Sequence, residues 1–124
     1  MKDLVAELAG CDIDGRPVLQ DTATLRRLGE VAVRIKYLEV VCQRSISATL
    51  HGGDALGSAS LAKSVWAEVG QELAALAFDV LGPLGEHRRW SEYRLTSRSL
   101  TIAGGTTQIN KSVTATRVLG LPRR

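Results

Sequence analysis

The chain has 124 residues, of which 44% are hydrophobic and 23% charged, and its formal net charge at pH 7 is +3. This length predicts one domain with a real core, and the scattered positive charge gives no support to nucleic-acid binding. No apolar run approaches the roughly 20 residues that cross a bilayer, and Asp3 and Glu7 interrupt any signal peptide, so we expect a cytoplasmic protein without a membrane segment.

A short first helix is predicted over residues 3–9, and it ends at Gly10. Its apolar side chains share one side, but a helix this short is not stable without packing. Those side chains are Leu4, Val5 and Leu8. Residues 11–20 are then a connection, because Gly15 and Pro17 break regular structure.

A long helix is predicted from Asp21 to Leu50, since Asp21 and Thr22 suit the N-cap region and Gly52-Gly53 ends the pattern. Apolar residues recur along it at intervals of three, four and seven, and a second set widens the stripe. The first set is Leu25, Leu28, Ala32, Ile35, Cys42 and Ile46, and the second is Val31, Leu38 and Val41. The other helices do not cover a stripe this wide, so we expect an exposed apolar patch and a dimer or higher oligomer.

The next helix is expected to begin near Ser58 or Ser60 and to end at Leu81, where Gly82-Pro83 stops it. Its periodic apolar positions predict one inward face, made by Leu61, Val65, Val69, Leu73, Leu76 and Val80. Trp66 falls inside this pattern, which favours a packing anchor or an interface residue over a ligand-stacking role.

Residues 84–101 are predicted to be irregular and charged, with room for a short helical piece. A last helix is predicted from Thr106 or Thr107, one of which is the N-cap, to Leu119, and Gly120 suits the left-handed position after its end. Its inner face is expected to contain Ile109, Val113 and Val118.

These elements predict an all-α fold: an antiparallel helical bundle with two long helices, a C-terminal helix and a short first helix, in one domain over residues 1–124. No alternating strands or internal repeats are found. Two thiols are too few for a disulfide framework, so we interpret Cys42 as a core residue and Cys11 as a loop thiol. No Cys/His cluster has ligand spacing, so no metal site is predicted.

The turn before the last helix has the features of an anion site. Gly104-Gly105 frees the backbone, and the following helix start leaves unpaired N–H groups at the positive end of its dipole. Such a turn suits a phosphate or pyrophosphate, although most Gly-Gly-Thr turns are only helix starts. Both interpretations remain open on these residues alone.

The C-terminal residues resemble the signature of the acyl-CoA dehydrogenase family, in which a segment of the type Ile-Tyr-Glu-Gly-Thr-x-Gln-Ile-x-Arg opens the last long helix and Leu-Gly ends it. The matches are Ile102, Gly105, Thr106, Gln108, Ile109, Arg117, Leu119 and Gly120. Earlier segments resemble the family's pattern in the same order, and these are Gly15-Arg16-Pro17, Gln43-Arg44, Ala62-Lys63 and residues 81–85. The likeness covers nearly the whole chain and concerns only the family's C-terminal helical domain.

The resemblance implies a flavoprotein oxidoreductase of fatty-acid or lipid metabolism, in which this domain helps to bind FAD and builds subunit interfaces. It implies flavin contacts from Gly82, Gly104, Gly105, Thr106 and Gln108. The family's N-terminal helical domain and middle β-domain complete the flavin and acyl-CoA sites, and neither is expected in this chain. Acyl-CoA is therefore expected only in a complete assembly, with a partner chain that carries the rest.

Some positions depart from the family's pattern. Many members place a catalytic Glu just before the Gly-Thr to take the α-proton of the acyl thioester, whereas Gly104 stands there in this chain. Cys11 replaces an Arg and Asp79 replaces a Gln, and both changes weaken anion binding. Glu7, the carboxylate nearest to the position of the base in other members, is interpreted as a surface residue, so no catalytic residue is assigned.

Two functions are consistent with these residues. The first is the C-terminal domain of an FAD-dependent acyl-CoA dehydrogenase, which contributes part of the flavin site and the oligomer interface to α,β-desaturation of acyl-CoA thioesters. The second is a non-catalytic helical oligomerisation or interaction module derived from that family, which Gly104, Cys11 and Asp79 favour. A small independent enzyme is disfavoured, because no paired carboxylates or nucleophile–base pair occur at helix spacing.

Overall fold

The structure is a computed structural model of the chain and describes residues 1–82 and 88–122. Within these ranges the chain forms five α-helices, which are α1 (Lys2–Leu8), α2 (Thr22–Leu50), α3 (Ala55–Leu81), α4 (Arg88–Thr96) and α5 (Thr107–Arg117). Two short antiparallel strands, β1 (Asp12–Ile13) and β2 (Arg16–Pro17), lie between α1 and α2. The predicted all-α fold class is confirmed.

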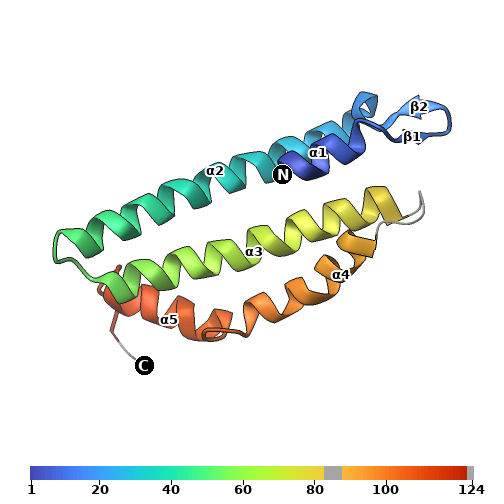
Figure 1. Cartoon of the computed structure of the whole chain (residues 1–124). Helices are drawn as coiled ribbons and strands as arrows, with labels where there is room; N and C mark the ends of the chain where they lie inside the picture. The colour runs from blue at the N-terminus through green and yellow to red at the C-terminus, as the bar shows by residue number, and fades with distance from the viewer. Residues whose placement is uncertain (83–87, 123–124) are drawn as a thin grey trace.

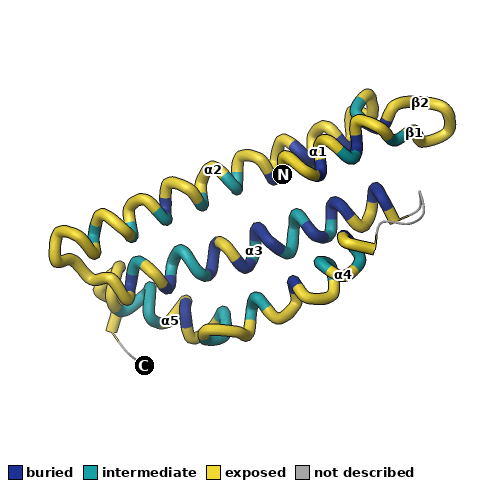
Figure 2. Tube along the Cα trace, viewed as in Figure 1, coloured by how far each residue is buried: buried dark blue, intermediate teal, exposed yellow. Residues whose placement is uncertain are grey.

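Helix α3 lies at the centre of the arrangement. It runs antiparallel to α2, while α4 and α5 follow one another along its other side (Figure 1). Figure 2 shows the consequence, because α3 is buried or half-buried along most of its length whereas α2 is largely exposed. The exposed helix surface of this part of the bundle therefore lies mainly on α2.

Helix α2 begins as predicted, at an aspartate N-cap. The Oδ2 atom of Asp21 accepts a hydrogen bond from the main-chain N–H of Thr24 at 2.7 Å, and this satisfies a donor that the helix itself leaves unpaired. Hydrogen bonds from Thr24 hold the pKa of Asp21 below its usual range.

Helix α3 begins earlier than predicted. The Oδ1 atom of Asp54 accepts hydrogen bonds from the main-chain N–H groups of Leu56 and Gly57, both at 3.1 Å. This cap starts the helix at the next residue, so the prediction of a start near Ser58 or Ser60 is wrong.

One apolar core lies where α1, α2, α3 and α4 meet. Its buried members are Leu4, Leu8, Val18, Leu28, Val31, Leu76, Ala77, Val80, Leu81 and Trp90. The predicted inward face of α3 is confirmed, since Val65, Val69, Leu76 and Val80 are buried and Leu61 and Leu73 are half-buried. Trp66, by contrast, is exposed and anchors no core.

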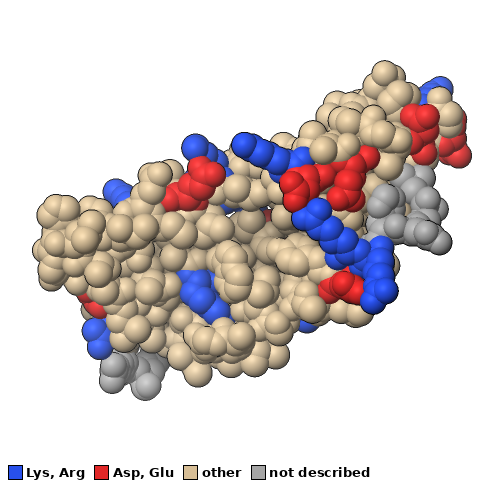
Figure 3. Space-filling view, viewed as in Figure 1, with Lys and Arg blue, Asp and Glu red and all other residues tan. Residues whose placement is uncertain are grey.

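Polar contacts at the edge of this core hold α1 against α4. The Nε1 of Trp90 donates a hydrogen bond to Oε2 of Glu7 at 2.6 Å, and the guanidinium of Arg89 lies 2.6 Å from Oδ2 of Asp3. The hydrogen bond and charge of Arg89 hold the pKa of Asp3 below its usual range, and Asp3 raises the pKa of Arg89. Acidic and basic side chains lie against one another over this end of the bundle (Figure 3). Helix α1, too short to be stable alone, gains its packing here.

The segments predicted to be irregular contain regular structure. Residues 11–20 hold the β1–β2 pair, because Asp14 (φ 52°) and Gly15 (φ 74°) form the left-handed turn of a small hairpin. Each strand has only two residues, too few for the alternating pattern that the sequence lacks. The expected helical piece in residues 84–101 is α4, and a 3₁₀ turn at Ser97–Thr101 follows it.

Helix α2 exposes apolar side chains because only one side of it is covered. Val33, Tyr37 and Val40 follow one another at helical spacing and are exposed, Val33 to 70%. Leu25 and Ile46 of the predicted stripe are also exposed, since α3 and the 3₁₀ turn at Val18–Gln20 are the main elements that contact α2. The expectation of exposed apolar surface is confirmed.

In the described ranges the two cysteines are unbridged, and neither a metal-binding cluster nor a membrane-spanning helix is found. Cys11 and Cys42 are free thiols, and both are half-buried. Cys11, and not Cys42, packs against the core, so the prediction of Cys42 as a core residue is wrong. No group of three or more His, Cys, Asp or Glu side chains in the described residues is placed to hold a metal ion. None of the helices in those residues combines the length and the apolar character that crossing a membrane requires.

Candidate functional site

The candidate site is the turn that leads into α5. Gly104 and Gly105 both adopt left-handed backbone conformations, with φ of 67° and 95°. Thr106 follows as the N-cap, and its Oγ1 accepts a hydrogen bond from the main-chain N–H of Ile109 at 3.3 Å. The prediction that Thr106 or Thr107 caps the helix is confirmed for Thr106. At the other end, the helix stops at Arg117 and Gly120 takes the predicted left-handed conformation.

Two side chains from different helices hold the carbonyl oxygen of Gly105. The Nζ of Lys63, on α3, donates to it at 2.8 Å, and the Nδ2 of Asn110, on α5, donates to it at 2.8 Å. Asn110 also donates to the carbonyl oxygen of Thr106 at 3.0 Å. The turn is therefore fixed to both helices through one main-chain oxygen.

The outer side of the turn presents hydrogen-bond donors. In the described part of the chain, the main-chain N–H groups of Thr106, Thr107 and Gln108 have no acceptor. Gln108 is exposed, and its side-chain amide makes no hydrogen bond to the described residues. These groups lie at the positive end of the α5 dipole, where an anionic or strongly polar group is stabilised.

Helix α5 turns a different face to α3 than the sequence predicts. Asn110 is only 6% exposed, whereas Ile109 is 57% exposed, Val118 is exposed and Val113 is half-buried. The predicted inner position of Ile109 is therefore wrong, because the two hydrogen bonds of Asn110 compensate for its burial and Ile109 points outward instead. Val118 is 47% exposed, and its Cγ2 faces Gly57 of α3.

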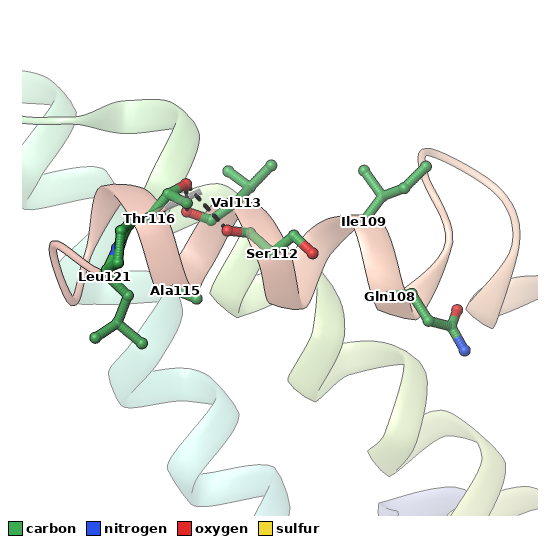
Figure 4. A pocket seen from close by; sticks show the side chains of 8 residues that line it. Gln108, Ile109, Ser112, Val113, Ala115, Thr116 and Leu121 are labelled. Atoms are coloured by element: carbon green, nitrogen blue, oxygen red, sulfur yellow. Dashed lines mark hydrogen bonds between the residues drawn. The ribbon is translucent and has the colours of Figure 1, made fainter. Parts of the chain in front are cut away.

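The outward residues of α5 line a shallow groove of about 770 Å³. Figure 4 shows Ile109 and Val113 projecting from the same side of the helix, with Leu121 at its far end and Gln108 at the end that carries the turn. The groove thus continues from the turn along an apolar helix surface.

Gly82 does not join the other predicted site residues. It follows the end of α3, whereas the turn is attached to α3 at Lys63, and the intervening stretch of helix spans about 28 Å at 1.5 Å per residue. The predicted stop at Gly82 agrees with the end of α3 at Leu81, while Pro83, Leu84 and Gly85 lie outside the described residues. Gly104, Gly105, Thr106 and Gln108 are adjacent, and Gly82 is separate within this chain.

Asp79, which replaces a Gln of the family's pattern, is separate from the turn within this chain. It lies near the end of α3, and its Oδ2 accepts a hydrogen bond from Arg27 of α2 at 2.7 Å. Its charge is thus paired, and it lies on the part of α3 remote from the turn. Lys63 is the cation that reaches the turn.

Lys63 and Asn110 are the residues of the turn that the sequence prediction did not include. Lys63 enters the sequence analysis only through the Ala62-Lys63 resemblance, and Asn110 does not enter it. No local pattern shows that both reach one carbonyl, because the contact of Lys63 joins residues 42 positions apart.

Substituting Gly105 by alanine is expected to disturb this turn more than substituting Gly104. Both glycines are left-handed, which costs an L-residue roughly 1–2 kcal/mol. A Cβ at Gly105 would also lie 3.2 Å from Nδ2 of Asn110, whereas one at Gly104 would lie 4.0 Å from Cε of Lys63. Urea unfolding of both variants measures the difference, and equal losses would show that the Asn110 contact does not constrain position 105.

Comparison with known proteins gives consistent matches. The family described as "Acyl-CoA dehydrogenase, C-terminal domain" matches residues 3–119. Acyl-CoA dehydrogenase IpdE1 of Mycobacterium tuberculosis is 40% identical in an alignment 73 residues long, which covers 54% of this chain and 19% of that relative. The chain therefore spans about a fifth of the length of that curated relative.

Two solved structures share the fold. The FAD complex of PigA superposes with a TM-score of 0.84 at 18% identity, over 97% of this chain and 32% of that one. The ChsE4–ChsE5 complex from Mycobacterium tuberculosis contains a chain with a TM-score of 0.83 at 21% identity, over 99% of this chain and 35% of that one. At these identities the likeness establishes the arrangement of the helices.

Proposed function

The chain belongs to the acyl-CoA dehydrogenase family, and from that membership we propose that it serves as the C-terminal helical domain of an FAD-dependent acyl-CoA dehydrogenase. The observation that carries the proposal is the family match over residues 3–119. In this proposal residues 1–124 form one domain, which contributes part of the flavin site and part of an oligomer interface. The desaturation of an acyl-CoA thioester then belongs to the complete assembly.

The donor set of the turn fits the polar part of a flavin nucleotide. Main-chain N–H groups of Thr106 and Thr107, the Thr106 hydroxyl and the Gln108 amide are the donors that phosphate oxygens and polar ring atoms accept. The ammonium of Lys63, 2.8 Å from the Gly105 oxygen, adds positive charge beside them. We propose that Gly104, Gly105, Thr106 and Gln108 hold part of FAD, and that Gly82 takes part only through another copy or chain.

FAD, when bound, supplies the acceptor for the hydride that leaves the β-carbon of the thioester. The residues of this chain would orient it and keep the turn in place. Gly104 has no side chain to take the α-proton, so we propose that the catalytic base and the acyl-CoA contacts come from elsewhere in the assembly.

The test is FAD binding by the purified chain, measured by flavin fluorescence and by the visible spectrum after gel filtration. Retained flavin, weakened by Gln108→Leu but not by Gln20→Leu, is the expected result, because Gln20 is an exposed glutamine outside the turn. No binding at FAD concentrations up to about 1 mM, either by the chain alone or by the chain combined with the family's other two domains, would contradict a flavin role for the turn.

The second candidate, a non-catalytic interaction module, is favoured by the exposed apolar side chains of α2 and by the α5 groove. Such surfaces mark interfaces between proteins more often than they remain in water. A homo-oligomer that is stable on size exclusion and indifferent to FAD would support this function, and a chain that stays monomeric over a wide concentration range would contradict it.

A further inference from the structure

We propose that Lys63 and Asn110 are positioning residues that set the conformation of the Gly104–Thr106 turn and thereby aim its donors at the ligand. The identity of that ligand rests on the proposed function. The positioning is a property of this chain that can be measured without any ligand.

Both lone pairs of the Gly105 carbonyl oxygen have a donor. A carbonyl oxygen has two lone pairs, and at Gly105 they meet Nζ of Lys63 and Nδ2 of Asn110, each at 2.8 Å. One donor comes from α3 and the other from the first turns of α5. The oxygen is therefore held from two directions by helices that are themselves packed together.

The Gly105–Thr106 peptide unit links the held carbonyl to a main-chain donor. The C=O of Gly105 and the N–H of Thr106 share one planar trans peptide group and point in opposite directions. A carbonyl directed at Lys63 and Asn110 therefore turns the Thr106 N–H away from them. That N–H is the first of the three main-chain donors that have no acceptor in the described part of the chain.

Gly104 and Gly105 do not by themselves favour the left-handed conformation of the turn over others. Glycine populates left-handed and right-handed backbone regions about equally, so Gly104 and Gly105 permit the turn without enforcing it. The selection must come from the side chains that bind the carbonyl. Asn110 is suited to this because its burial and its second hydrogen bond, to the Thr106 carbonyl, restrict its own rotation.

The experiment compares the full chain with Lys63→Met, which keeps most of the side-chain length but removes the donor. Lys63→Arg restores a charged donor and is the rescue variant. Lys111→Met is the matched control, because it removes a positive charge from α5 whose ammonium lies 3.8 Å from Glu68. Two quantities are measured on each variant: amide hydrogen exchange by NMR and the affinity for FAD.

The expected result is a local change. The amides of Ile109 and Asn110 bond to Oγ1 and O of Thr106, and in Lys63→Met their exchange should accelerate about tenfold. The amides of Val69 and Leu76 in α3 should keep their exchange rates. FAD affinity should fall by a similar factor in Lys63→Met, recover in Lys63→Arg and stay unchanged in Lys111→Met.

Asn110→Leu is a second variant that removes both amide donors at similar side-chain volume, and it should accelerate exchange at Ile109. Unchanged exchange at Ile109 in both Lys63→Met and Asn110→Leu would overturn the inference. An equal acceleration throughout α3 would also overturn it, because that pattern indicates general destabilisation. A loosened turn with unchanged FAD affinity would refute its link to the ligand. Local loosening in a chain that binds no FAD at all would support positioning while refuting the proposed function.

Discussion

Replacing Leu76 with alanine is expected to lower the free energy of unfolding by about 2–5 kcal/mol. Leu76 is 1% exposed and belongs to the core shared by α1, α2, α3 and α4. Truncation leaves a cavity in the central helix, and helices packed on both sides of α3 limit how far the structure can collapse into it. A shift of the urea midpoint at constant slope measures the loss.

The matched control for this variant is Leu95→Ala. Leu95 lies on α4 and is 75% exposed, so its truncation should change stability by no more than about 0.5 kcal/mol. If the two variants proved equally stable, the core assigned to α3 would be wrong.

Replacing Gly57 with valine is expected to cost about 1–3 kcal/mol, because it overfills the contact between α3 and α5. A Cβ at Gly57 would lie 3.0 Å from Cβ of Arg117 and 3.0 Å from Cγ2 of Val118. It would also lie 2.9 Å from Oδ2 of Asp54, the residue that caps α3. The variant should lose stability and should also loosen α5, which amide hydrogen exchange of that helix would detect.

Gly29→Ala is the control for a helical glycine without close neighbours. No atom lies within 4 Å of a Cβ built at Gly29, so alanine there should stabilise the chain by about 0.5–1 kcal/mol through helix propensity. A Gly57→Val variant as stable as the unmodified chain would mean that α5 does not approach α3 closely at this position.

The spacing of apolar residues predicted the burial of a helix correctly where neighbouring helices cover it along its whole length. The inward face of α3 was predicted correctly because α3 is covered on two sides, so each of its turns places apolar residues against a neighbouring helix. The start of α2 at Asp21 was predicted because an N-cap is a local interaction that a few residues determine.

The same reasoning failed where a polar contact decides the orientation of a helix. On α5, the apolar spacing placed Ile109 inward, but the need to satisfy the Gly105 carbonyl turns Asn110 inward instead. On α2, Leu25 and Ile46 belong to the apolar stripe and yet are exposed. How much of α2 is covered depends on how the other helices pack against it, which the spacing of residues in α2 does not determine. The resemblance located the turn, but it did not identify Lys63 as its contact across the fold.

The hydrogen bond between Trp90 and Glu7 joins residues 83 positions apart, and this has a consequence for synthesis on the ribosome. Residues of α1 leave the ribosome early, but a helix of this length does not persist without a partner. The α2–α3 hairpin can pair once α3 has emerged, whereas α1 gains its contacts with Trp90 and Arg89 only after α4 has followed. A nascent chain whose emerged part ends before Arg88 would therefore lack the Trp90 and Arg89 contacts of α1, and the full packing of α1 would be completed late.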